Sequence, residues 1–506
     1  MSQVNSLATI NTHALNGVTP IPVCVEVHIS NGLPALAIVG LPEAAVRESK
    51  DRVRAAIINC GLEFPARKIT VNLAPADLPK DGGRYDLPIA IGILAASRQI
   101  PDEFLHQYEF HGELALSGAL RSVSGALPIA IGSKLQQRTL ILPASCAQYG
   151  ALIHTADILQ ADHLLDVCKF FHRQHELNRP EINIPKKINS ELDISDVKGQ
   201  HRAKRALEIA AAGNHNMLMI GPPGTGKTML ASRLASLLPP LNEQQAIESA
   251  AICSISHQGF DLSNWMQRPF RAPHHTASGV ALVGGGSIPK PGEISLAHNG
   301  VLFLDELTEF DRHTLDVLRE PLESGSITIS RAARQAEFPA NFQLIAAMNP
   351  CPQGYSCDGK NLCQCTIEQQ RKHRSRISAP LLDRIDIHIE VPSVDRRALS
   401  DTKEKNETNT DFKKRINSAY DMQMKRCGKS NALLTSRETE IHCRLNEKEQ
   451  SLLEQAMEKL NLSARAYHRI LRMSRTIADL DSKLEIEEQH LSEAISYRSL
   501  DRLMNS

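Results

Sequence analysis

The stretch that decides the fold of this chain is Gly221-Pro222-Pro223-Gly224-Thr225-Gly226-Lys227-Thr228. It completes the pattern Gly-x-x-x-x-Gly-Lys-Ser/Thr and directly follows the apolar run Met217–Ile220. Glycines let backbone N–H groups curl around phosphates, Lys227 reaches the outer phosphates, and the Thr228 hydroxyl can ligate Mg²⁺. The apolar run predicts a buried strand and residues 229–238 predict a helix, so the loop joins the elements that a nucleotide site needs. The sequence therefore predicts an α/β fold that binds ATP or GTP, with a glycine-rich turn that binds no nucleotide as the alternative.

Length and charge limit the possible architectures. The chain has 506 residues, which indicates roughly two to four domains. Lys plus Arg equal Asp plus Glu at 57 each, so any nucleic-acid surface must be local. The first residues lack the basic start and apolar core of a secretion signal, and no apolar run approaches the roughly 18 residues of a membrane span. We therefore expect a soluble, cytoplasmic protein without a membrane partner.

Composition along the chain predicts four segments. Residues 1–172 mix short strand patterns with helical patterns, which indicates one compact α/β domain. Residues 173–196 are polar, contain prolines and show no sustained periodicity, as is typical of a linker. We expect the nucleotide-binding domain over residues 197–395, including an insertion and a hairpin. Residues 396–506 open with a charged connector and continue in helical patterns without strand signals, which predicts a helical domain.

Two more apolar runs of the central domain end in polar residues suited to nucleotide hydrolysis. Residues 300–304 lead into Asp305 and Glu306, the form of a Walker B element. Asp305 would hold the Mg²⁺ shell and Glu306 would polarise the attacking water. Residues 342–348 lead into Asn349, whose amide could orient water near the γ-phosphate. The alternative for Asn349 is that it only opens the turn with Pro350.

Two arginines are candidates for transition-state stabilisation. Arg384 lies between Asp383 and Asp386 just before a predicted strand, an unusual place for an unpaired surface charge. An arginine finger acting on a neighbouring subunit explains it and contributes about 10³ to 10⁵ in rate; an ion pair within its own subunit is the alternative. Arg465 follows Ser463, a predicted helix N-cap, and so falls in the first turn of a helix. Its alternative is an ordinary solvated arginine.

Together these motifs resemble the AAA+ superfamily and, within it, the magnesium-chelatase-like branch. The chain is identified as a member of the ComM/YifB family. Besides the Walker B strand, the resemblance rests on Arg271-Ala-Pro-His-His-Thr-Ala-Ser278, Val283-Gly-Gly-Gly286, Pro291-Gly-Glu-Ile-Ser-Leu-Ala-His298, Ala346-Ala-Met-Asn-Pro-Cys351 and Leu381-Leu-Asp-Arg-Ile-Asp386. The match spans nearly all of the chain, and residues 72–86 resemble the family's amino-terminal part, which is related to the proteolytic domain of Lon.

The resemblance implies a fold and a site. It implies a Lon-protease-like α/β N-terminal domain, an AAA+ P-loop NTPase core and a C-terminal helical lid domain, with ATP and Mg²⁺ as cofactors. Arg384 resembles the family's arginine finger and Arg465 its second sensor, while Val197 and Gln200 fall where AAA+ proteins contact adenine. The residues that keep the roles argued above are Lys227, Thr228, Asp305, Glu306 and Asn349.

The resemblance also implies an activity. Such proteins are ring-forming motors, usually homo-hexamers, in which one subunit completes the next subunit's active site. ComM-like members are associated with branch migration of DNA in recombination during natural transformation. Single-stranded or branched DNA and recombination proteins are then the expected partners. Peptidase activity is not expected, because Gly83-Arg84-Tyr85-Asp86 contains no serine where Lon carries its nucleophile, and Lys134 alone lacks the partner it would activate.

Two other function classes share the ATPase motifs. A magnesium-chelatase motor subunit is one, although we expect such a subunit to lack the N-terminal domain. A MoxR-like ATP-driven protein-remodelling chaperone is the other, and its hydrolysis should not depend on DNA.

A hairpin and a histidine pair remain within the central domain. Residues 327–330 and 335–338 predict two strands whose turn carries Arg331 and Arg334, so a ring of six would present about a dozen positive charges to its pore. A DNA-tracking hairpin is the hypothesis, and arginines paired with acids are the alternative. For the adjacent residues His274 and His275 we expect packing, because two histidines without further ligands are a weak metal signal; contact with DNA or a neighbouring subunit is the alternative.

Four cysteines lie close together after Asn349: Cys351, Cys357, Cys363 and Cys365. Four thiolates in one loop of a cytosolic protein indicate a closed tetrahedral Zn²⁺ site, which would order a loop too polar to build its own core. Their spacing is not that of standard Cys-x-x-Cys pairs. Free or redox-sensitive thiols and a disulfide are the alternatives.

Overall fold

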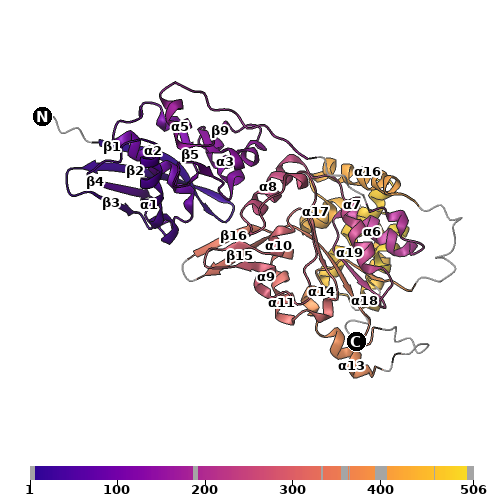
Figure 1. Cartoon of the computed structure of the whole chain (residues 1–506). Coiled ribbons are helices and arrows are strands. Elements are labelled where there is room, and N and C mark those ends of the chain that lie inside the picture. The colour runs from indigo at the N-terminus through magenta and orange to yellow at the C-terminus, as the bar shows by residue number, and fades with distance from the viewer. Residues whose placement is uncertain are drawn as a thin grey trace. The chain divides into compact units, whose positions relative to one another are not determined.

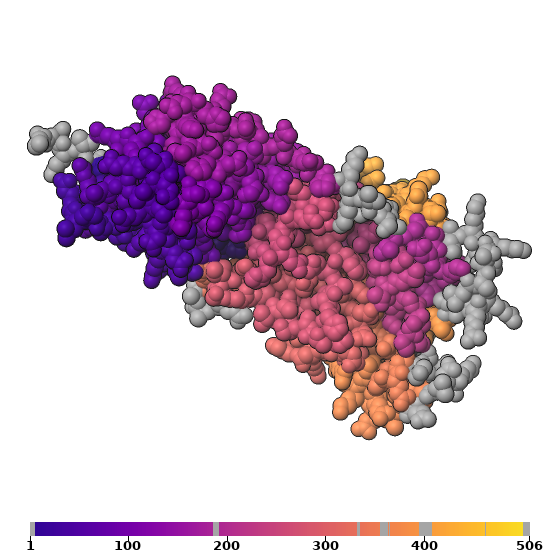
Figure 2. All heavy atoms as spheres, in the orientation of Figure 1, coloured from indigo at the N-terminus to yellow at the C-terminus, as the bar shows by residue number. Residues whose placement is uncertain are grey.

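The computed structural model describes residues 6–185, 192–331, 334–354, 363, 365–393, 407–460 and 462–498. The chain forms two compact units. Unit 1 comprises residues 1–187, 250–265 and 333–337, and unit 2 comprises residues 188–249, 266–332 and 338–506. Because the colours of Figures 1 and 2 follow the chain, the N-terminal part of unit 1 is indigo to magenta and the C-terminal helices of unit 2 are orange to yellow.

Unit 1 is built on a seven-stranded mixed sheet of order β3-β4-β2-β1-β5-β8-β9. Its β1–β2 and β2–β4 pairs are antiparallel and the remaining pairs are parallel. Alternate residues of β2, from Val23 to Ile29, are buried, as expected for a strand with one face on the core. The strands are β1 (Ser6–Asn16), β2 (Thr19–Ser30), β3 (Ala35–Val39), β4 (Lys68–Ala74), β5 (Tyr108–Phe110), β8 (Thr139–Pro143) and β9 (Ile158–Ala161). A separate short pair is β6 (Glu113–Leu114) with β7 (Leu120–Arg121).

Helices cover this sheet, and one of them is buried along its whole length. Every residue of α2 (Asp86–Ala96) is buried. The hexapeptide Leu-Pro-Ile-Ala-Ile-Gly occurs in α2 and again in α3 (Ala126–Leu135), each time with its proline in the first turn, where the missing N–H costs no helical hydrogen bond. The other helices are α1 (Ala44–Asn59), α4 (Ala144–Ala151) and α5 (Leu164–Phe171).

Unit 2 contains a five-stranded sheet of order β11-β14-β17-β10-β18 in which every pair is parallel. The parallel direction brings the carboxyl ends of neighbouring strands to one edge of the sheet, where α/β proteins bind ligands. The strands are β10 (Met217–Ile220), β11 (Phe270–Arg271), β14 (Val301–Leu304), β17 (Gln343–Met348) and β18 (Ile387–Glu390). The α/β fold that the sequence predicts is thus confirmed, and the structure adds that this sheet is parallel.

Short helices and two small sheets connect these strands. The helices beside the core strands are α6 (His201–Gly213) and α7 (Lys227–Leu237). The connecting helices are α8 (Glu243–Ser254), α9 (Gly279–Val283), α10 (Glu293–Leu296), α11 (Arg312–Asp316), α12 (Pro321–Ser324), α13 (Ile367–Arg374) and α14 (Ala379–Leu382). The small sheets are β12 (Gly284–Gly285) with β13 (Lys290–Pro291), and β15 (Ser326–Arg331) with β16 (Arg334–Pro339). The last sheet is the predicted hairpin.

The described residues after position 406 are helical, with no strand among them. Ser463 caps α19, since its Oγ accepts the Ala466 N–H at 3.2 Å. The helices are α16 (Asn409–Cys427), α17 (Ser436–His442), α18 (Glu447–Leu460), α19 (Ala464–Leu480) and α20 (Glu488–Ser496). Helices α16 and α19 contact α6 (Figure 1), so they share one hydrophobic core with the parallel sheet.

Within the described ranges, the structure contains no helix that is both long enough and apolar enough to cross a membrane.

Candidate active site

The phosphate loop connects β10 to α7 at the carboxyl edge of the parallel sheet. Gly224 and Gly226 have φ angles of +77° and +83°, a region that residues with a Cβ rarely adopt. Among the described residues, no heavy atom lies within 4 Å of the position that a Cβ of Gly224 would occupy, beyond its chain neighbours. The loop therefore leaves its backbone open at the amino end of α7, the arrangement that binds phosphate groups.

Lys227 joins the phosphate loop to the neighbouring strand. Its buried Nζ donates hydrogen bonds to the carbonyl oxygens of Gly221 at 2.7 Å and Pro222 at 2.9 Å. It also donates to Asn349 Oδ1, at the end of β17, at 3.2 Å. Burial lowers the pKa of Lys227, while the carboxylates of Asp305 and Glu306 act in the opposite direction. The amide of Asn349 thus lies beside the lysine that would hold the outer phosphates.

Thr228 and Asp305 provide oxygen ligands suited to Mg²⁺. The Thr228 hydroxyl donates to Asp305 Oδ2 at 2.6 Å, although the two residues belong to different elements, α7 and the end of β14. The other oxygen of Asp305 accepts the Glu306 N–H at 2.9 Å. Hard oxygen ligands of this kind suit Mg²⁺, which usually keeps several waters and binds through one or two protein groups plus phosphates. The two side chains therefore fit the metal that the phosphate loop requires.

Glu306 has a partner that sequence reasoning did not identify. His275 Nδ1 lies 2.9 Å from Glu306 Oε2, and both side chains are partly exposed. The ring of His274 lies 4.1 Å from that of His275, centroid to centroid. His275 follows β11, which pairs with β14, so the parallel pairing brings it to the same edge as Glu306. No local sequence pattern indicates this contact, because a strand of two residues leaves no periodicity to read.

An open cleft of about 820 Å³ lies over these residues. It is lined by residues 223–229, Asp305, Glu306, Met348 and Asn349. Val197 and Gln200 are not among the lining residues. Gln200 instead supports the loop, because its Nε2 donates to the Thr225 carbonyl at 2.6 Å, and Val197 is buried in the core of unit 2.

The two candidate arginines share one carboxylate, that of Glu323 on α12. Arg384 forms an ion pair with Glu323, and Arg465 Nη2 lies 3.5 Å from the same Glu323 Oε1. The Arg384 side chain is buried and its Nη1 also donates to the Pro380 carbonyl at 2.6 Å. Neither arginine lines the cleft of its own chain.

Asp386, one of the two acids that the sequence offered as partners for Arg384, has other partners. Its carboxylate pairs with Arg469, accepts the Asn216 N–H at 3.0 Å and lies 3.5 Å from His215 Nδ1. Burial alone would raise the pKa of Asp386, but the charges of Arg469 and His215 hold it below its usual range. Asp386 therefore fixes the start of β18, while Glu323 holds Arg384.

Of the two hairpin arginines, the structure describes the side chain of Arg334 but not that of Arg331. Arg334 forms an ion pair with Glu43, which belongs to the same compact unit. Burial lowers the pKa of the Arg334 guanidinium. Arg331 ends β15, and its side chain lies outside the described residues.

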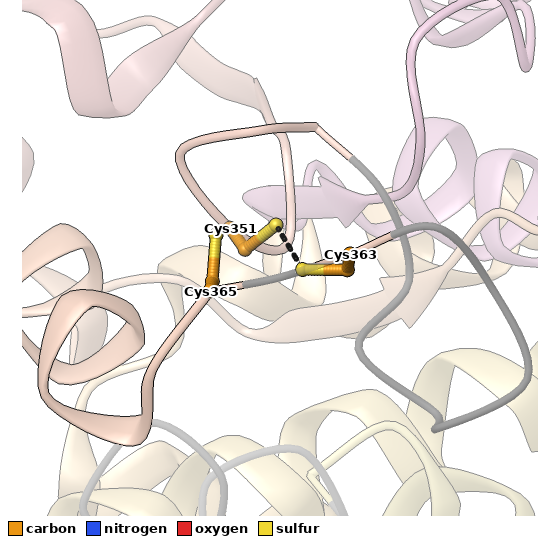
Figure 3. Close-up of side chains that lie close together, drawn as sticks. All are labelled: Cys351, Cys363 and Cys365. Atoms are coloured by element: carbon orange, nitrogen blue, oxygen red, sulfur yellow. Dashed lines mark hydrogen bonds between the residues drawn. The ribbon is translucent and has the colours of Figure 1, made fainter.

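Three of the four clustered cysteines lie together (Figure 3). The Sγ atoms of Cys351, Cys363 and Cys365 lie within 4.8 Å of one another, and those of Cys351 and Cys363 are 3.5 Å apart. None of the three is in a disulfide. Cys357 lies outside the described residues.

Comparison with known proteins matches segments of both units to family models named after one protein, the ChlI subunit of magnesium chelatase. Residues 193–399 match the family model described as "Magnesium chelatase, subunit ChlI", and residues 406–498 match the model of the C-terminal part of that subunit. Residues 25–146 match a third model, described as "Subunit ChlI of Mg-chelatase". Because this model carries the chelatase name, the N-terminal unit does not by itself separate the chain from the chelatases, contrary to our expectation.

Two individual relatives match this chain over nearly its whole length, and a third matches it over part of its length. The competence protein ComM of Haemophilus influenzae is 51% identical over 99% of both chains. YifB of Salmonella typhimurium is 52% identical over 99% of this chain and 98% of its own. The magnesium-chelatase 67 kDa subunit of Heliobacterium mobile is 28% identical and covers 32% of this chain.

Proposed function

Because this chain belongs to the ComM/YifB family of magnesium-chelatase-like AAA+ proteins, we propose that it is an ATP-hydrolysing hexameric ring motor that drives branch migration of DNA. The observation that carries the proposal is the convergence of Lys227, Thr228, Asp305, Glu306 and Asn349 at one sheet edge, around one open cleft. These residues lie on one helix, α7, and at the ends of two strands, β14 and β17, which only the fold brings together.

Each residue has a defined role in hydrolysis. The phosphate loop and Lys227 bind the β- and γ-phosphates of ATP. Thr228 and Asp305 would hold Mg²⁺, which when bound would supply positive charge beside the phosphates. Glu306 accepts a proton from the attacking water, and the amide of Asn349 orients that water or the γ-phosphate. His275 fixes the Glu306 carboxylate, and Gln200 holds the phosphate loop through the Thr225 carbonyl.

Arg384 and Arg465 act on the nucleotide of the neighbouring subunit. Both lie outside the cleft of their own chain and share Glu323, so they form one cationic cluster. In a ring, such a cluster would face the γ-phosphate bound next door, where Arg384 contributes about 10³ to 10⁵ in rate. The helices from α16 to α20 then act as a lid domain that carries Arg465.

DNA is the proposed substrate. The relative from Haemophilus influenzae is named a competence protein, which supports a role in natural transformation. The hairpin of β15 and β16 would present Arg331 to DNA phosphates in the pore, and Arg334 would join it only on leaving its ion pair with Glu43. Recombination proteins would supply the branched DNA on which the motor acts.

Two other functions would use the same ATPase site: that of a magnesium-chelatase motor subunit and that of a MoxR-like protein-remodelling chaperone. The alignment favours the DNA motor, because the chelatase subunit of Heliobacterium mobile covers 32% of this chain and ComM covers 99%.

For unit 1 we propose a Lon-like fold without peptidase activity. Two observations support the absence of peptidase activity. The buried Asp86 carboxylate accepts a hydrogen bond from Arg52 Nε at 2.7 Å, and Lys134 is exposed at the end of α3.

The test is ATP hydrolysis with and without single-stranded or branched DNA across a range of low salt concentrations. We expect DNA to raise the rate, most strongly at the lowest salt, because phosphate contacts weaken as salt increases. Lys227→Ala is the control for hydrolysis by contaminants. A rate that ignores DNA at every salt concentration would exclude the DNA motor and favour the chaperone class.

A further inference from the structure

We propose that Cys351, Cys363 and Cys365 bind a Zn²⁺ ion that holds the loop after β17 against the phosphate loop. Their Sγ atoms lie within 4.8 Å of one another (Figure 3), close to the ~3.8 Å that tetrahedral Zn–S bonds of about 2.3 Å would give. The Cys351–Cys363 separation of 3.5 Å is far longer than the ~2.05 Å of a disulfide bond. A soft divalent ion suits three thiolates better than Mg²⁺ does.

The cluster joins the end of a core strand to the start of a surface helix. Cys351 is fully buried and follows Asn349 at the end of β17. Cys365 directly precedes Thr366, whose side chain caps α13 by accepting the Gln369 N–H. A metal ion bound by cysteines from both sides would therefore tie the end of a core strand to the beginning of a surface helix.

The same loop contacts the nucleotide site. A Cβ on Gly354 would lie 3.1 Å from Pro223 Cδ and 3.9 Å from Asn349 Nδ2. The backbone at Gly354 therefore packs against the phosphate loop and against the side-chain amide of Asn349. On α13, buried His373 places Nε2 3.2 Å from the Asn349 carbonyl oxygen. The cysteine loop and α13 thus contact Asn349 from two sides, and the Zn²⁺ ion would fix both contacts.

This arrangement gives the ion a positioning role. Nothing in it requires the metal to touch ATP or water, because the three thiolates belong to the loop and the cleft is lined by other residues. Loss of the ion should loosen Asn349 and Pro223 together and slow ATP turnover several-fold. ATP binding through Lys227 should change less, since Lys227 is held by the carbonyl oxygens of Gly221 and Pro222.

Metal analysis of the purified full chain tests the proposal. We expect close to one zinc per chain, and loss of most of it in Cys363→Ser with Cys365→Ser. Cys427→Ser, which removes a half-buried cysteine at the end of α16, is the matched control and should keep its zinc. Iron in place of zinc, or zinc retained by the double variant, would overturn the assignment.

A second measurement does not depend on folding of the variants. A thiol-modifying reagent added to the wild type should release zinc in step with the modification of the cluster, as read by a metal-binding dye. Absence of zinc release from protein whose thiols react fully would also overturn the proposal. The predicted effect of zinc on ATP turnover rests on the proposed function, whereas the predicted zinc content does not. A protein that binds zinc but hydrolyses no ATP would therefore contradict the proposed function and leave the zinc site standing.

Discussion

Lys227 and Glu306 should separate binding from hydrolysis. Lys227→Ala removes a buried ammonium from the phosphate site, and loss of a charged hydrogen bond costs about 1.5–3 kcal/mol, so ATP binding should weaken about 10- to 100-fold. Glu306→Gln keeps the binding groups and removes the general base, so ATP should stay bound while turnover falls at least about 10²-fold. Equilibrium binding and single-turnover hydrolysis measure the two effects. Normal turnover in Glu306→Gln would contradict the assignment of the base.

His275 should influence turnover through Glu306. Its ring lies 2.9 Å from the Glu306 carboxylate and does not line the cleft, so His275→Ala should lower kcat several-fold and leave ATP affinity nearly unchanged. His313→Ala is the matched control, because His313 is an exposed histidine on α11. Steady-state kinetics give the comparison. Equal kcat for the two variants would show that the ion pair has no role in hydrolysis.

At the residue scale, the sequence predicts contacts within a motif better than contacts between motifs. The fixed spacing of the phosphate loop indicates the roles of Lys227 and Thr228. The contacts of His275 with Glu306 and of Glu323 with both arginines depend on strand order and helix placement. No local pattern encodes those, since the partners come from elements far apart in the chain.

At the element scale, strands with turn signals and amphipathic helices were the predictable parts. The predicted strand over residues 300–304 is observed as β14, and the predicted helix over 229–238 as α7. The helix α2 gave no amphipathic signal, because apolar residues surround it and every one of its residues is buried. Strand β1 pairs with β2 through a hairpin whose two-residue turn is Gly17-Val18, so its register follows from a local turn signal in the sequence.

The hairpin of β15 and β16 should serve DNA and not hydrolysis. Arg331→Ala with Arg334→Ala should abolish or strongly reduce DNA unwinding and leave ATP turnover without DNA unchanged, because the cleft residues that hold ATP belong to other elements. Arg437→Ala with Arg444→Ala removes two exposed charges outside the hairpin and serves as the control. Strand-displacement and ATPase assays run in parallel would test this. Full unwinding by the hairpin variant would exclude the pore-hairpin hypothesis.

At the scale of the whole molecule, the shared active site makes a prediction about mixtures. Arg384→Ala chains lack the finger and Glu306→Gln chains lack the base, so each alone should be nearly inactive. A mixed ring contains interfaces where an intact base meets an intact finger, and its ATPase rate should exceed that of either variant alone. No gain at any mixing ratio would favour an Arg384 that serves only its ion pair with Glu323.

The central claim is that ATP hydrolysis at the cleft drives work on DNA. Its most direct test is strand exchange at a labelled branched DNA, measured for the wild type and for Glu306→Gln with ATP present. We predict ATP-dependent movement of the branch by the wild type and none by Glu306→Gln, although both bind the DNA. Hydrolysis of ATP by the wild type without any movement of the branch, under conditions where the DNA is bound, would contradict the account.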